Sequence, residues 1–200
     1  MASEAERIIG LYQRYAIEWD RERGRSLFEQ AWLDQFLAVL APRPSVLDIG
    51  CGAGEPIARY LAEKGCDVTG VDSSSALIGM CKDRFPDHEW FVADMRTLSL
   101  DRRYDGIMAW DSFFHLCPED QRQMFPIFRK HARPNAALMF TSGHLYGEAI
   151  GTLQGEPLYH GSLDVEEYRW LLHQNGFDVV KNVVEDPDCG YRTIWLAQIR

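Results

Sequence analysis

Short apolar runs of strand length alternate with longer segments of helical periodicity along most of the chain. The runs are continuously apolar, a pattern typical of strands that are buried on both faces of a parallel sheet. We expect strands at residues 46–49, 67–72, 89–94, 104–110, 136–141, 177–185 and 191–200. The alternation predicts an α/β fold with a doubly wound sheet, in which ligands bind at the carboxyl ends of the strands.

Helical periodicity predicts helices between these strands, at residues 55–64, 74–84, 118–131 and 164–174. Two more helices are expected before the first strand. Residues 3–18 begin with Ser3 and Glu6 in capping-box spacing, and residues 27–40 form the second helix. The charged residues 19–25 between them predict a linker.

The length and the apolar fraction are those of one domain. With 200 residues, 46% of them hydrophobic, the chain can bury one core, so we expect a single domain over residues 1–200 with N-terminal helices in residues 1–42. Residues 143–163 hold five glycines and make a longer connection than compact domains usually need. We predict that this connection is a cap on the substrate side, and that the last two strands form an antiparallel hairpin.

The charge balance argues against nucleic acid as a partner. Acidic residues outnumber basic ones, the net charge is −9, and no block of lysines and arginines could follow a phosphate backbone. The five cysteines are scattered, as in a protein with reduced thiols. No apolar run is long enough to cross a membrane, and the acidic N-terminus is unlike a signal peptide. We therefore expect a soluble, cytoplasmic protein, monomeric or homodimeric.

Three glycines at alternate positions follow the first predicted strand and precede a helix: Gly50, Gly52 and Gly54. Glycine permits a positive φ and lets a ligand lie against bare backbone, while the amides of the helix N-terminus point at that ligand. Asp72 ends the second predicted strand, close to where a ribose-binding acid belongs in such a βαβ unit. The stretch therefore predicts a site for a nucleotide-like ligand.

These motifs together resemble the class I S-adenosylmethionine-dependent methyltransferases that act on small molecules. The resemblance is carried by Asp48-Ile49-Gly50-Cys51-Gly52-Ala53-Gly54, by Asp72 and by Val92-Ala93-Asp94-Met95. It implies a seven-stranded Rossmann-like sheet of order 3-2-1-4-5-7-6 with strand 7 antiparallel, and S-adenosylmethionine as the cofactor.

The resemblance also implies roles for individual residues. The glycine turn would cradle the methionine part and the ribose, Asp72 would accept both ribose hydroxyls, and Asp94 with the Met95 amide would hold the adenine. Trp110 would lie beside the sulfonium, and Tyr15, in the stretch Tyr12-x-x-Tyr15-x-x-x-Trp19, would approach the cofactor carboxylate. The complete implied cofactor set is Tyr15, Asp48, Gly50, Gly52, Gly54, Asp72, Ser73, Asp94, Met95 and Trp110.

Two other functions remain open from the residues alone. A nicotinamide-dependent oxidoreductase shares a glycine turn and a ribose acid. The spacing G-x-G-x-G, and the acid two residues before the first glycine, count against it, and Asp94 has no counterpart there. A non-catalytic protein that binds S-adenosylmethionine is the other alternative.

Methyl transfer needs an aligned acceptor and, for a neutral O–H or N–H acceptor, a base. His115, His144 and His160 are the candidate bases, and His115 is preferred because it follows the fourth strand in an aromatic loop. Phe114, His144 and Tyr146 are the candidate residues for binding a small-molecule acceptor. Asp111 is a possible metal ligand, but no clear second acidic ligand follows the fifth strand, so no metal is expected.

Overall fold

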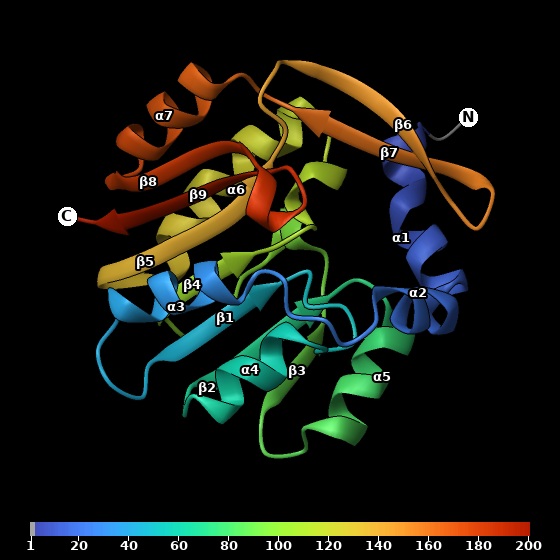
Figure 1. Cartoon of the computed structure of the whole chain (residues 1–200), viewed down its shortest axis with the longest axis horizontal. Coiled ribbons are helices and arrows are strands. Elements are labelled where there is room, and N and C mark those ends of the chain that lie inside the picture. The colour runs from blue at the N-terminus through green and yellow to red at the C-terminus, as the bar shows by residue number, and fades with distance from the viewer. Residues whose placement is uncertain (1–2) are drawn as a thin grey trace.

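A seven-stranded sheet forms the centre of the computed structural model, which describes residues 3–200. Its order is β3 (Glu89–Val92), β2 (Asp67–Asp72), β1 (Ser45–Ile49), β4 (Tyr104–Ala109), β5 (Ala132–Ser142), β9 (Arg192–Ile199) and β8 (Phe177–Asp186) (Figure 1). The first five strands are parallel, and β9 runs antiparallel to both of its neighbours. The predicted topology is confirmed, with β8 and β9 as the expected strands 6 and 7.

Helices cover both faces of this sheet. On one face α3 (Gln30–Ala38), α4 (Ile57–Glu63) and α5 (Ser75–Arg84) pack on the strands through residues such as Phe36, Leu61 and Ile78. On the other face α6 (Pro118–His131) and α7 (Val165–Gln174) contribute Phe125, Phe128 and Tyr168 to an aromatic core that also contains Trp195 of β9. Three layers of this kind leave only the carboxyl ends of the strands open to a ligand.

The N-terminal region departs from the prediction. Instead of one helix over residues 3–18 and a charged linker, the chain forms α1 (Glu4–Arg14) and α2 (Ala16–Arg23), which meet at Tyr15. Tyr15 leaves helical geometry with φ −106° and ψ 26°. The expected linker is mostly helical because its charges have partners: both oxygens of Asp20 accept hydrogen bonds of 2.7 Å from Arg84 in α5.

The glycine-containing connection is also more regular than expected. Residues 143–163 contain the hairpin β6 (Gly147–Leu153) and β7 (Glu156–Ser162), a separate two-stranded sheet whose turn is formed by Gln154 and Gly155 at positive φ. Figure 1 shows this hairpin reaching from the sheet across to α1. Cross-strand pairing, which local composition does not reveal, therefore gives the predicted cap its structure.

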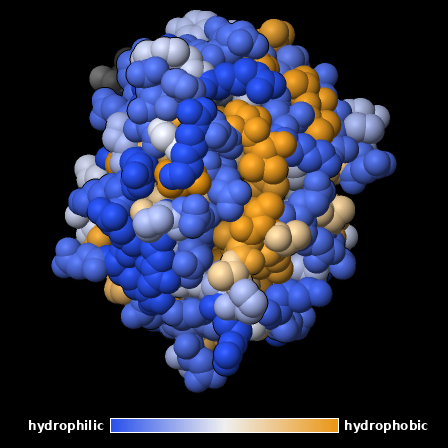
Figure 2. All heavy atoms as spheres, turned by 90° about the vertical axis from the view of Figure 1, so that its left-hand side faces the viewer, coloured by the Kyte–Doolittle hydropathy of each residue, from blue (hydrophilic) through white to orange (hydrophobic). Residues whose placement is uncertain are grey.

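The opposite end of the molecule has a different surface. Figure 2 shows the side at the left of Figure 1, away from the arrowhead of β1, where a band of hydrophobic residues lies among mostly hydrophilic ones.

Across residues 3–200, no helix combines the length and the apolar character that crossing a membrane requires.

Candidate active site

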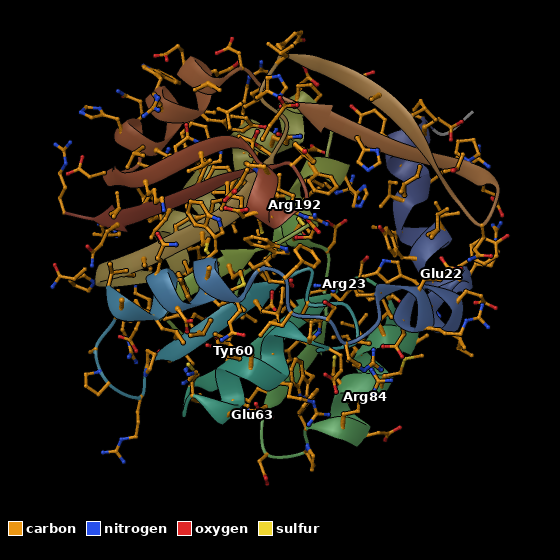
Figure 3. All side chains as sticks on the ribbon, viewed as in Figure 1. Glu22, Arg23, Tyr60, Glu63, Arg84 and Arg192 are labelled. Carbon is orange, nitrogen blue, oxygen red and sulfur yellow. The ribbon has the colours of Figure 1, made fainter. Side chains whose placement is uncertain are left out.

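Two cavities adjoin at the carboxyl ends of β1, β2 and β4, beneath α1 and α2. We call them the first and the second cavity. Residues Tyr12, Trp19, Gly50, Asp111 and His115 border both. Figure 3 shows Arg23 and Arg192, which border the second cavity, in the region between these strand ends and α2. Residues of the N-terminal helices thus complete a site that the sheet begins.

The glycine turn forms one wall of the first cavity. Gly50 and Gly52 have φ values of 77° and 55°, where side chains are strained. A Cβ on Gly52 would come within 2.5 Å of the ring of Trp19, and one on Gly50 would overlap Ser112. Both positions therefore require glycine, because Ser112 and Trp19 pack directly against the turn. Gly54, also predicted for the cofactor, instead faces Phe85 in the core.

Asp72 closes the turn from the end of β2. Its Oδ2 accepts the N–H of Gly52 at 3.0 Å and its Oδ1 accepts the N–H of Ser74 at 2.8 Å. Burial raises the pKa of this carboxyl, against the opposing effect of these backbone donors. A carboxylate has about four acceptor positions, so each oxygen keeps one for a further hydroxyl donor. Ser73 borders the same cavity.

Asp94 and Met95 lie at the far end of the first cavity, after β3. Asp94 is held by Arg96, whose Nη2 donates to Oδ2 at 2.6 Å. Burial alone would raise the pKa of Asp94, but the hydrogen bonds from Arg96 outweigh burial and keep that pKa below its ordinary value. Arg96 also borders the cavity, a contribution that the sequence pattern did not indicate.

His115 lies in the wall between the two cavities, within a hydrogen-bonded chain. Its Nδ1 is 2.8 Å from the carbonyl oxygen of Tyr159, so Nδ1 carries the proton, and its Nε2 accepts from the hydroxyl of Tyr12 at 2.9 Å. Burial lowers the pKa of His115 to about 4 and raises that of Tyr12. At neutral pH both groups are uncharged, and both ring nitrogens of His115 have partners.

The second cavity contains an ion pair at its edge. Asp111 follows β4 at φ 47°, and both of its oxygens accept from Nε of Arg192 at 2.8 Å, with Nη2 of Arg192 at 2.6 Å from Oδ2. Asp111, which the sequence offers only as a possible metal ligand while no metal is expected, is thus engaged by Arg192. Among residues 3–200 no cluster of three potential metal ligands occurs.

Several predicted residues border the second cavity. Asp48, Trp110 and Phe114 do so, and burial raises the pKa of Asp48 to about 7. The indole N–H of Trp110 is buried and has no hydrogen-bond partner within the described part of the chain. His160, one of the candidate bases, also borders this cavity, and burial lowers its pKa.

Other predicted residues border neither cavity. Gly54 faces the core, the hydroxyl of Tyr15 donates to Glu156 at 2.6 Å, Nδ1 of His144 is 3.7 Å from Glu185, and Tyr146 is 61% exposed.

Tyr12, and not Tyr15, borders both cavities. The spacing of residues in α1 could have indicated Tyr12. Residues three and four apart share one face of a helix, and Ile8, Ile9 and Tyr12 all border the first cavity. Tyr15, by contrast, lies past the last residue of α1.

Comparison with known proteins places this architecture in a family. A family model described as a methyltransferase domain matches residues 19–182. The chain therefore belongs to this methyltransferase family, and the family predicted from the sequence is confirmed.

Three of its relatives share less than a third of the aligned residues with this chain. The chain is 28% identical over 137 residues to a malonyl-[acyl-carrier protein] O-methyltransferase from Salmonella typhimurium, covering 68% of this chain and 53% of the relative. It is 32% identical over 155 residues to the enzyme of that name from Pseudescherichia vulneris, covering 76% and 57%. The chain thus spans little more than half the length of these curated relatives. The CcbJ methyltransferase from Streptomyces caelestis has a similar fold, with a TM-score of 0.74, 17% identity and 99% of each chain covered.

Proposed function

We propose that this protein transfers the methyl group of S-adenosylmethionine to an oxygen or nitrogen of a small molecule. The observation that carries the proposal is the first cavity, where the half-buried carboxylate of Asp72 lies against the glycine turn and accepts the N–H of Gly52. In a methyltransferase fold, this arrangement offers what a nucleoside with two ribose hydroxyls needs.

Different residues of the first cavity bind different parts of the cofactor. Asp72 accepts the ribose hydroxyls with its two free acceptor positions, Asp94 and the Met95 amide bind the adenine, and the glycine turn lies against the methionine part. The cofactor itself supplies an activated methyl group on a positively charged sulfur.

The second cavity holds the acceptor. Aromatic side chains line it, among them Trp110, Phe114 and His160, and they can position a small molecule by contact and exclude water. Two relatives are named for O-methylation of a malonyl group, which agrees with a small reacting group. The hairpin β6–β7 contributes His160 and Leu158 to this wall, so it acts as the cap on the substrate side.

A neutral acceptor would have to release a proton in this cavity. The hydroxyl oxygen of Tyr12 can accept that proton while its own proton passes to Nε2 of His115, and the Tyr159 carbonyl steadies the resulting imidazolium. His115 then acts through Tyr12. Its low pKa makes it a weak base, so this route suits only acceptors that are themselves acidic.

Calorimetry tests the proposed function. S-adenosylhomocysteine should bind and NAD should not, because the residues of the first cavity match one nucleoside and include no second phosphate-binding turn. Preferential binding of NAD would overturn the proposal. Binding of S-adenosylmethionine without methyl transfer to any acid, alcohol or amine would favour a non-catalytic binding protein.

A further inference from the structure

Arg192 has its orientation fixed before any ligand arrives. Two sides of its guanidinium hydrogen-bond Asp111, and its plane lies 4.5 Å from the centre of the Phe28 ring. Nη1 has only long contacts, 3.4 Å to the carbonyl of Cys189 and 3.5 Å to that of Gly190. A half-buried cation at the edge of the second cavity therefore keeps donor capacity for an anion.

The side chain of Trp110 borders the same cavity and carries a buried indole N–H. Its side chain is 4% exposed, and its indole N–H has no hydrogen-bond partner among residues 3–200. A buried N–H without a partner loses its hydration and gains nothing in return, which costs about 1–3 kcal/mol. A ligand oxygen in the second cavity would remove this cost.

The charges around the second cavity leave room for one anion. Three ion pairs account for most of the charge here: Arg192 with Asp111, Arg23 with Glu29, and Glu55, which also borders the cavity, with Arg59. Burial raises the pKa of Asp48 to about 7, so this carboxyl carries only part of its charge at neutral pH. The positive charge on the sulfur of a bound cofactor then attracts an anionic acceptor.

We propose that the acceptor presents a carboxylate, which Arg192 and Trp110 hold in the second cavity and which is converted to a methyl ester. A carboxylate is ionised at neutral pH, so it needs no base, in agreement with the engagement of both nitrogens of His115. A lone pair of the carboxylate oxygen forms the new O–C bond, and the electrons of the broken C–S bond stay on sulfur. No proton is released. This inference rests on the proposed methyl transfer.

Matched probes test the charge of the acceptor. We would load the protein with S-adenosylhomocysteine and measure by calorimetry the binding of benzoate, benzyl alcohol and benzylamine, and of hexanoate, hexanol and hexylamine. Each acid should bind at least about tenfold more tightly than the alcohol or amine of the same shape, because only the acid accepts charged hydrogen bonds. With S-adenosylmethionine, an acid that binds should give a product that releases methanol in base.

Two variants test whether Arg192 and Trp110 donate hydrogen bonds to the acceptor carboxylate. Arg192→Gln should weaken binding of the acids by about tenfold to a hundredfold and leave the affinity for S-adenosylhomocysteine unchanged. Trp110→Phe keeps the ring, removes only the N–H and should weaken the acids severalfold, which provides a second test if Arg192→Gln misfolds. Arg200→Gln is the control, because Arg200 is exposed and pairs with Asp178 at the end of the chain.

Three results would overturn the inference: no acid binds at millimolar concentration, the alcohols or amines bind as tightly as the acids, or the methyl group enters a base-stable product. Failure of S-adenosylhomocysteine itself to bind would instead contradict the proposed function.

Discussion

The two cavities differ in whether main chain or side chains form their walls. The first depends on main chain and on acids at the strand ends: Gly50 and Gly52 at positive φ, Asp72 bound to the backbone of the same turn, and Asp94 after β3. The second depends on side chains from separate elements, among them Trp110 after β4, His160 in β7 and Arg192 in β9. A backbone site can keep one cofactor while side chains around the other cavity change, so we expect the second cavity to determine which acceptor is bound.

A methyl group at the centre of the glycine turn should have the largest effect. Gly52→Ala places a Cβ 2.5 Å from the Trp19 ring at φ 55°, so we expect binding of S-adenosylhomocysteine to weaken by about a hundredfold or more and stability to fall by roughly 1–2 kcal/mol. Calorimetry and urea denaturation measure the two effects.

The control for this change is Gly79→Ala. Gly79 lies in α5, and no atom comes within 4 Å of the position that an alanine Cβ would take there, so alanine should stabilise the protein by roughly 0.5–1 kcal/mol. Equal affinities in Gly52→Ala and Gly79→Ala would show that the turn does not touch the cofactor.

The wall between the cavities should be sensitive to acid. Burial holds the pKa of His115 at about 4 against 6.5 in the unfolded chain, so the unfolded chain takes up a proton first as the pH falls. The stability that neutral His115 contributes is complete above about pH 6.5 and is lost toward pH 4, roughly 3 kcal/mol in total.

His115→Gln lacks this contribution, so its free energy of unfolding should fall less than that of the wild type between pH 7 and pH 4. Urea denaturation at several pH values measures the difference between the two proteins. The raised pKa of Asp48 acts in the opposite direction, but it is common to both and cancels. Parallel pH profiles would mean that His115 titrates normally and is not enclosed.

Removal of the ribose acid should affect the first cavity alone. Asp72→Ala should weaken binding of S-adenosylhomocysteine by about 1.5–3 kcal/mol, the range for hydrogen bonds to a charged group. Binding of acids to the second cavity of the cofactor-loaded protein should stay unchanged. Asp178→Ala, which removes an exposed acid paired with Arg200, is the control. An Asp72→Ala protein with wild-type affinity would move the ribose site elsewhere.

The contact between the cap and α1 should have the smallest effect. Glu156 of β7 accepts from Tyr15 and pairs with Arg14, and α1 in turn covers the first cavity. Glu156→Gln should speed hydrogen exchange in α1 while exchange in the central sheet stays the same. Glu166→Gln, at an exposed position in α7, is the control. Unchanged exchange would show that packing alone holds α1 in place.

Local pattern predicted the first cavity well. Apolar runs and turn glycines lie next to one another in the chain, so the alternation of strands and helices and the positions of Gly50, Gly52 and Asp72 could be read from sequence. The strand order followed from the family resemblance. Met95 likewise borders the first cavity as expected. The roles of these residues remain predictions until a ligand is bound.

The features of the site that the sequence did not reveal depend on contacts between residues far apart in the chain. Arg192 reaches Asp111 only because β9 inserts beside β5. Tyr12 borders the cavities, whereas Tyr15, at the break between α1 and α2, donates to Glu156. His144 was expected near the acceptor, but its nearest charged partner is Glu185. Contacts between residues so far apart in sequence leave no local periodicity to detect.

A crystal structure of the protein with S-adenosylhomocysteine tests the central claim most directly. The account predicts both ribose hydroxyls on the oxygens of Asp72, the adenine beside Asp94 and Met95, and the thioether sulfur facing the second cavity between Tyr12 and Trp110. A ligand bound outside the first cavity, or bound within it with its sulfur turned away from the second, would contradict the account.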